Sequence, residues 1–222
     1  MKWWLVVVAV LSGLSEGWGQ FCGQNHSERI AQVHETADVL MGDKPNLVLT
    51  GSSSIRMWPG LDAVFPEHDV VNAGFGGSCF SDLWKLRDTL IYTLHPDVLF
   101  IYEGDNDLSD GVDPDSIMWH ASLLLDEVGR RLPLTRVVVI APKQSIARRH
   151  LSQQYISLNH RLRTAAMNQG ASWVNFWDAQ HHPDGQLRED LFVQDGLHLN
   201  RKGYAVWVDE LRRQVPWLIP SK

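Results

Sequence analysis

Residues 46–54 read NLVLTGSSS, an apolar run that ends at Gly51 and is followed by three serines. A short apolar run that stops at a glycine is typical of a buried β-strand. Serine is a preferred residue at helix N-termini, so the three serines predict a helix directly after the strand. A serine in such a turn can expose its hydroxyl group close to the free N–H groups of the helix.

The same alternation of strand and helix continues along the chain. Apolar runs predict four further strands, at 68–73, 97–102, 136–141 and 172–176. Apolar residues at helical spacing predict helices at 28–41, 80–90, 116–132, 153–168 and 203–215. Continuous apolar runs suit a parallel sheet that is covered on both faces, and alternating elements indicate an α/β fold with right-handed crossovers. No internal repeat or low-complexity linker appears, so we expect residues 20–222 to form one domain.

The first 19 residues differ from the rest of the chain. Lys2 precedes the apolar stretch 3–14, and Gly17 and Gly19 form a small-x-small pattern just before Gln20. This arrangement predicts a secretory signal peptide over residues 1–19, and hence a secreted or periplasmic protein. A retained anchor is the alternative, but the stretch is shorter than the roughly 20 residues that a span needs. No second candidate span follows it.

Charge and cysteine content narrow the class of protein further. The formal net charge is −6 with a pI of about 5.9, which argues against a nucleic-acid partner, because phosphate binding requires a basic surface. The only two cysteines, Cys22 and Cys79, lie in the predicted mature chain. They form either a disulfide, as exported proteins allow, or two unpaired thiols.

Residues suited to catalysis follow the predicted strands, where ligands bind in open parallel sheets. The strand at 68–73 ends in the glycine cluster 74–77, which is either a flexible turn or a backbone donor to an oxyanion. Asn106 follows the strand at 97–102, and its side-chain amide is a natural oxyanion donor. Asp195 and His198 stand three apart before the last helix, so the carboxylate can orient the imidazole.

These four motifs occur in the order Gly-x-Ser, Gly, Gly-x-Asn and Asp-x-x-His, and the sequence thereby resembles the SGNH or GDSL-type hydrolase family. The resemblance extends from residue 47 to residue 204 and implies a three-layer, flavodoxin-like α/β/α sandwich around a five-stranded parallel sheet. It implies that Ser53 is the nucleophile, His198 the base and Asp195 its orienting partner. It also implies an oxyanion hole formed by the N–H groups of Ser53 and Gly77 and the side chain of Asn106.

One position departs from the family pattern. The first motif of the family usually reads Gly-Asp-Ser, whereas Ser52 replaces the aspartate here. That aspartate is not a member of the triad, and Ser54 is the second candidate for the nucleophile.

The resulting hypothesis is a secreted serine esterase that acts on esters of small molecules or carbohydrates and needs no metal or organic cofactor. Lysophospholipase and thioesterase activities are the alternative enzymatic functions. A non-catalytic carbohydrate-binding or adhesion domain on the same fold is the alternative from another class.

Two side chains close to Ser53 in sequence allow either a structural or a functional interpretation. Arg56 either pairs with an acidic group of the substrate or forms a structural salt bridge, and the salt bridge is the favoured interpretation. Trp58 either lines the substrate site or packs in the core, and packing is favoured.

Overall fold

The computed structural model describes residues 22–23, 25–40 and 42–219, so the predicted signal segment lies outside the described residues. Five strands form one sheet in the order β2-β1-β3-β4-β5, and all neighbouring pairs are parallel. The strands are β1 (Asn46–Gly51), β2 (Asp69–Gly74), β3 (Val98–Tyr102), β4 (Arg136–Ile140) and β5 (Ser172–Val174). The order reverses between β1 and β3, and this switch point is where parallel sheets open toward ligands.

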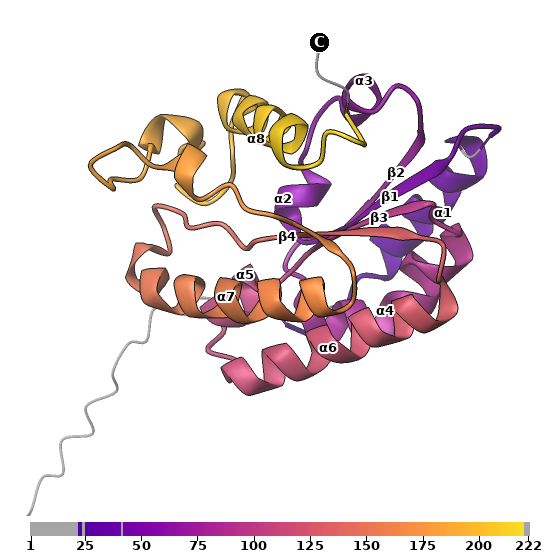
Figure 1. Cartoon of the computed structure of the whole chain (residues 1–222), viewed down its shortest axis with the longest axis horizontal. Helices are drawn as coiled ribbons and strands as arrows, with labels where there is room; N and C mark the ends of the chain where they lie inside the picture. Colours follow the sequence, from indigo (N-terminus) through magenta and orange to yellow (C-terminus); the bar gives the residue numbers. More distant parts are fainter. Residues whose placement is uncertain (1–21, 24, 41, 220–222) are drawn as a thin grey trace, which may run out of the picture.

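Helices cover both faces of the sheet (Figure 1). The longer ones are α1 (Ser27–Leu40), α4 (Phe80–Leu90), α6 (Pro114–Arg131), α7 (Ser152–Asn168) and α8 (Arg201–Gln214), and the one-turn helices are α2 (Ser53–Arg56), α3 (Leu61–Val64) and α5 (Asp105–Ser109). Val48 points into the core that α1, α4, α6 and α7 share with one face. Its neighbours Leu47 and Leu49 point into the core on the other face, beneath α2, α3 and α8. This alternation within one strand produces the two cores of a three-layer sandwich.

The predicted α/β/α sandwich and its five parallel strands are therefore confirmed. The helix at 80–90 has the predicted bounds, whereas α6 begins two residues earlier than predicted, at Pro114. The side chain of Asp113 accepts hydrogen bonds from the N–H groups of Asp115 and Ser116 there, and this cap sets the start of the helix. The serines after β1 predict the start of α2, whereas α3 and α5 were not predicted, because a single turn contains no 3.6-residue repeat. Among the described residues, no helix is both long and apolar enough to cross a membrane.

Candidate active site

The predicted motifs meet at the carboxyl edge of the sheet. Ser53 opens α2 directly after β1, and Asn106 lies in α5, which follows β3. Gly77 lies in the turn between β2 and α4. Asp195 and His198 lie in the loop that leads into α8. The position of each residue follows from the rule that parallel strands place their carboxyl ends at one edge.

The turn that presents Ser53 requires the glycine at position 51. Gly51 has a φ of 141°, and a Cβ on it would lie 2.3 Å from the carbonyl oxygen of Tyr102 on β3. The N–H group of Ser52 donates to that same oxygen over 3.2 Å. The two strands thus stay in contact up to the residue before Ser53, which makes the position of the serine rigid.

The two candidate nucleophiles have different surroundings. Ser54 is 1% exposed, and its backbone oxygen accepts a hydrogen bond from the hydroxyl of Tyr204 on α8 over 2.9 Å. Ser53 is partly exposed, and its Oγ lies 2.8 Å from Nε2 of His198. The geometry therefore favours Ser53 over Ser54.

Ser53, His198 and Asp195 form a hydrogen-bonded row. Nδ1 of His198 lies 2.6 Å from Oδ2 of Asp195, opposite the contact with Ser53. Burial alone would raise the pKa of Asp195, but hydrogen bonds from the His198 side chain and from backbone N–H groups outweigh it and lower this pKa. An ionised carboxylate only accepts hydrogen bonds, so Nδ1 of a neutral imidazole carries the proton. The lone pair of Nε2 then faces the Ser53 hydroxyl.

The loop that carries the imidazole is held by its own backbone. Oδ1 of Asp195 accepts hydrogen bonds from the N–H groups of Leu197 and His198 over 2.8 and 2.9 Å. The carbonyl oxygen of His198 accepts from the N–H group of Val193. Asn200 then caps α8 by accepting from Gly203 N–H over 3.0 Å, so the loop ends at a fixed helix.

The amide of Asn106 has one possible orientation. Its Oδ1 accepts from Nη2 of Arg148 over 2.9 Å, and its Nδ2 donates to the carbonyl oxygen of Ser78 over 2.8 Å. A guanidinium group only donates and a carbonyl only accepts, so a flipped amide would lose both bonds. One N–H of Nδ2 remains beyond the bond to Ser78.

The backbone donors predicted for the oxyanion hole are not used within the protein. In the described parts of the chain, the N–H groups of Ser53 and Gly77 donate to no protein acceptor. Ser53 is the first residue of α2, where N–H groups have no partner inside the helix. These two N–H groups and the amide of Asn106 are therefore available to an external oxygen atom.

A buried cluster of charged residues lies behind Asn106 and was not predicted from the sequence. Asp105 accepts hydrogen bonds from Arg148 and Tyr155, both over 2.5 Å, and lies 3.5 Å from Nζ of Lys143. Burial acts to raise the pKa of Asp105, but the charges of Lys143 and Arg148 hold it well below its usual range. The sequence does contain one indication of this cluster, which is the position of Lys143. It follows β4 and therefore lies at the same edge of the sheet as Asn106.

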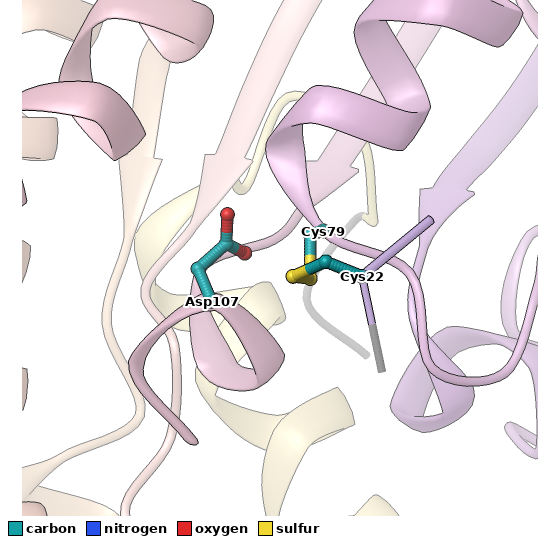
Figure 2. A group of neighbouring side chains, drawn as sticks. All are labelled: Cys22, Cys79 and Asp107. Atoms are coloured by element: carbon teal, nitrogen blue, oxygen red, sulfur yellow. A yellow bond between two sulfur atoms is a disulfide. The ribbon is translucent and has the colours of Figure 1, made fainter. Parts of the chain in front are cut away.

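Cys22 and Cys79 form a disulfide with Cα atoms 5.3 Å apart, which resolves the alternative left open by the sequence. Figure 2 shows the carboxylate of Asp107 beside this bond. Because the two sulfur atoms are joined to each other, neither is a thiolate that binds a metal ion. The Asp107 carboxylate instead accepts from the N–H group of Phe80, at the start of α4, over 3.2 Å.

The structure tests the structural interpretations of Arg56 and Trp58. Trp58 is buried and stacks on Tyr204 with ring centroids 5.6 Å apart, so its packing role is confirmed. Arg56 is exposed and, within the described ranges, forms no ion pair with any carboxylate. The prediction of a structural salt bridge at Arg56 is therefore wrong.

A cavity of about 800 Å³ lies next to the loop of Asp195 and His198 but is not lined by them. The N–H group of Ala147 donates to the carbonyl oxygen of Gly196, so the segment after β4, which supplies Gln144 and Arg149 to the lining, contacts the loop. The lining residues are Gln144, Arg149, Ser152, Trp177, Asp178, His181, His182, Pro183, Gly185, Gln186, Leu187 and Glu189. Most of these are polar, with one large aromatic ring.

Comparison with solved structures shows what this fold is similar to. A GDSL-like lipase from Bacteroides thetaiotaomicron has a TM-score of 0.70 at 16% identity, covering 85% of this chain and 97% of its own. A lipase/acylhydrolase from Enterococcus faecalis has a TM-score of 0.67 at 20% identity, with 80% and 99% covered. A catalytic mutant of an acetylxylan esterase from Geobacillus stearothermophilus has a TM-score of 0.67 at 16% identity, with 82% and 100% covered. At these identities the likeness shows the fold alone.

No curated protein sequence matches the chain. A family model does match it, over residues 42–206, which include Ser53, Gly77, Asn106, Asp195 and His198. The matched region contains every strand of the sheet. The chain belongs to the GDSL-like lipase/acylhydrolase family.

Proposed function

We propose that the protein is an exported serine esterase that hydrolyses acyl esters of small molecules or carbohydrates. The observation that carries the proposal is the row in which Ser53 Oγ lies 2.8 Å from His198 Nε2 while Asp195 holds Nδ1 over 2.6 Å. A hydroxyl next to a base that is itself oriented by a carboxylate is the arrangement of an activated nucleophile.

The reaction proceeds in two halves. Nε2 of His198 takes the hydroxyl proton as Oγ of Ser53 attacks the ester carbonyl carbon, and the carbonyl oxygen becomes an oxyanion. That oxygen accepts from Ser53 N–H, Gly77 N–H and the remaining N–H of Asn106. His198 gives its proton to the alcohol oxygen as the carbon–oxygen bond breaks, which leaves the acyl group on Ser53. Water, deprotonated by the same imidazole, then releases the acid and restores the hydroxyl.

The test is hydrolysis of p-nitrophenyl acetate by wild type and Ser53→Ala. We expect Ser53→Ala to abolish enzymatic release of p-nitrophenol, because within the described residues no other hydroxyl is hydrogen-bonded to Nε2 of His198. Ser122→Ala, an exposed serine on α6, is the matched control and keeps the wild-type rate. A fluorophosphonate probe should label Ser53, and labelling at any other residue overturns the assignment.

The same assay distinguishes an esterase from a non-catalytic domain. Equal and slow rates for wild type and Ser53→Ala across a range of acyl esters would point to a non-catalytic carbohydrate-binding or adhesion domain. Among the enzymatic activities, acetylated sugars compared with esters of rising chain length separate deacetylation from lysophospholipase or thioesterase activity.

The disulfide supports export, because such bonds persist in oxidising compartments. We expect the protein recovered outside the cytoplasm to begin at Gln20. Intact mass and N-terminal sequencing check this, and a chain that retains Met1 would contradict it.

A further inference from the structure

Two guanidinium groups near Ser53 lack a counter-charge, and we call Arg29 and Arg56 the arginine patch. Arg29 donates from Nε to the carbonyl oxygen of Gly74 over 2.9 Å and from Nη2 to that of Asn72 over 2.8 Å. Both acceptors are neutral, so the hydrogen bonds leave the charge of Arg29 uncompensated. Over the described residues neither arginine forms an ion pair, although the chain has a net charge of −6.

The two groups are close enough to repel each other. Partial burial lowers the pKa of Arg29, and the positive charge of Arg56 lowers it further. Two like charges without a shared acid raise the local positive potential. An anion that binds between or beside them relieves this repulsion.

The patch adjoins the proposed oxyanion hole on two sides. Arg56 is the last residue of α2, whose first residue is Ser53. Its guanidinium also lies against the backbone of Gly76, because a Cβ on Gly76 would lie 3.4 Å from Nε of Arg56. Gly76 directly precedes Gly77, the predicted oxyanion donor. The exposed charge therefore lies next to both turns that would hold the reacting carbonyl group.

We infer that Arg56 binds an anionic group, a carboxylate or a phosphate, on the ester substrate, and that Arg29 strengthens the positive potential there. The inference rests on the proposed ester hydrolysis and adds a substrate class to it. A guanidinium group offers two parallel N–H donors that match the oxygens of a carboxylate or phosphate. Arg56 is a specificity-determining residue in this account, while the acid–base chemistry stays with Ser53 and His198.

The experiment compares three acetate esters of para-substituted phenols, and each variant is compared with wild type on the same ester. Para-acetoxybenzoate carries a carboxylate, para-acetoxyphenyl phosphate carries a phosphate, and methyl para-acetoxybenzoate is neutral. We expect Arg56→Gln to lower kcat/KM for the preferred anionic ester by about five-fold or more, and to leave the neutral ester unchanged. Arg56→Glu should lower it further, and added salt should reduce the wild-type preference for the anionic ester.

Arg130→Gln on α6 is the matched control, since it removes the same charge from an exposed position and should leave all three rates unchanged. Equal changes in the neutral and anionic esters on Arg56→Gln would overturn the inference. If wild type did not hydrolyse the neutral ester, or if Ser53→Ala hydrolysed it equally well, the proposed function would be overturned instead. The two failures are therefore distinct. Comparison of the two anionic esters identifies the carboxylate or the phosphate as the preferred group.

Discussion

Arg148 donates to Oδ1 of Asn106 over 2.9 Å, and both side chains are 4% exposed. A cation on the amide oxygen orients the amide and draws electron density from its nitrogen, which makes the N–H a stronger donor. The same guanidinium group holds Asp105 through Nη1. Arg148 is therefore a positioning residue for the proposed oxyanion hole.

We predict that Arg148→Lys lowers kcat for p-nitrophenyl acetate about ten-fold with little change in KM. Removing an oxyanion donor costs roughly 10²–10³ in kcat, and a misplaced donor costs part of that. Lysine retains the charge beside Asp105 but cannot bond to two side chains as a planar fork does. Steady-state kinetics measure the split between kcat and KM.

Two comparisons separate positioning from general stability. In an Asn106→Ala background, Arg148→Lys should cause no further loss of kcat, because its effect passes through the missing amide. Tyr155→Phe removes hydrogen bonds to Asp105 and to Arg148 but leaves the bond between Arg148 and Asn106, so we expect a smaller loss of kcat than in Arg148→Lys. A full additional loss in the double variant would disprove the positioning role.

The carboxylate of Asp195 sets the tautomer of His198, so Asp195→Asn should lower kcat by about 10³-fold. The N–H groups of Leu197 and His198 require an oxygen at the position of Oδ1, so the new NH₂ group must face Nδ1. Nδ1 then becomes an acceptor, and Nε2 carries a proton that blocks it as a base. A buried aspartate costs about 10⁴-fold in this substitution, and Asp195 is 48% exposed, which moderates the loss.

Hydrolysis of p-nitrophenyl acetate measures this effect, with Asp209→Asn on the exposed side of α8 as the control. Retention of wild-type kcat in Asp195→Asn would exclude the carboxylate from orienting the imidazole.

The disulfide between Cys22 and Cys79 should contribute about 4 kcal/mol to the free energy of unfolding, because it closes a long loop in the unfolded chain. The two cysteines are 57 positions apart. We expect the double variant Cys22→Ala and Cys79→Ala to unfold at a lower urea concentration than wild type. Wild type treated with a reductant should match the variant, whereas identical midpoints before and after reduction would contradict the prediction.

The contribution of Asp107 to stability should fall as pH rises from about 4 to about 7, because burial raises its pKa from 3.8 to about 7. At Asp107 the folded state holds more protons than the unfolded chain in this window, so its deprotonation favours unfolding, on the order of 4 kcal/mol, while the lowered pKa values of His26 and His68 act in the opposite direction. Asp107→Asn should reduce the difference in free energy of unfolding between about pH 5 and about pH 8. Glu103, whose pKa is also raised by burial, should preserve a residual slope of the same sign. An unchanged difference in Asp107→Asn would show that Asp107 is not the titrating group.

The sequence predicts the elements that bury apolar residues and the residues that follow them. The run at 97–102 predicts β3 to within one residue, because a central strand of a parallel sheet is apolar on both faces. The strand order does not follow from such runs, since several arrangements satisfy the same crossovers. The contact of Arg148 with Asn106 joins positions 42 apart, and no local pattern encodes which buried charge meets which amide.

The site residues could be assembled from sequence for a simpler reason. Ser53, Asn106 and the pair Asp195 and His198 each follow or precede a recognisable element, so topology alone brings them to one edge. For Arg56 the sequence left an acidic substrate group as the less favoured alternative to a salt bridge, and it did not predict that Arg29 lies beside Arg56, because the two positions are far apart in the chain.

The carboxylate and the imidazole share one four-residue turn, in which Asp195 also binds the backbone of Leu197 and His198. Of the two bonds in the catalytic row, only the one to Ser53 joins distant parts of the chain, 145 positions apart. A shift of this loop against the sheet therefore lengthens a single distance and leaves the acid–base pair intact. The rate of the proposed ester cleavage should therefore depend on the docking of the loop, so substitutions in α8 far from the substrate should change turnover while the acid–base pair stays the same.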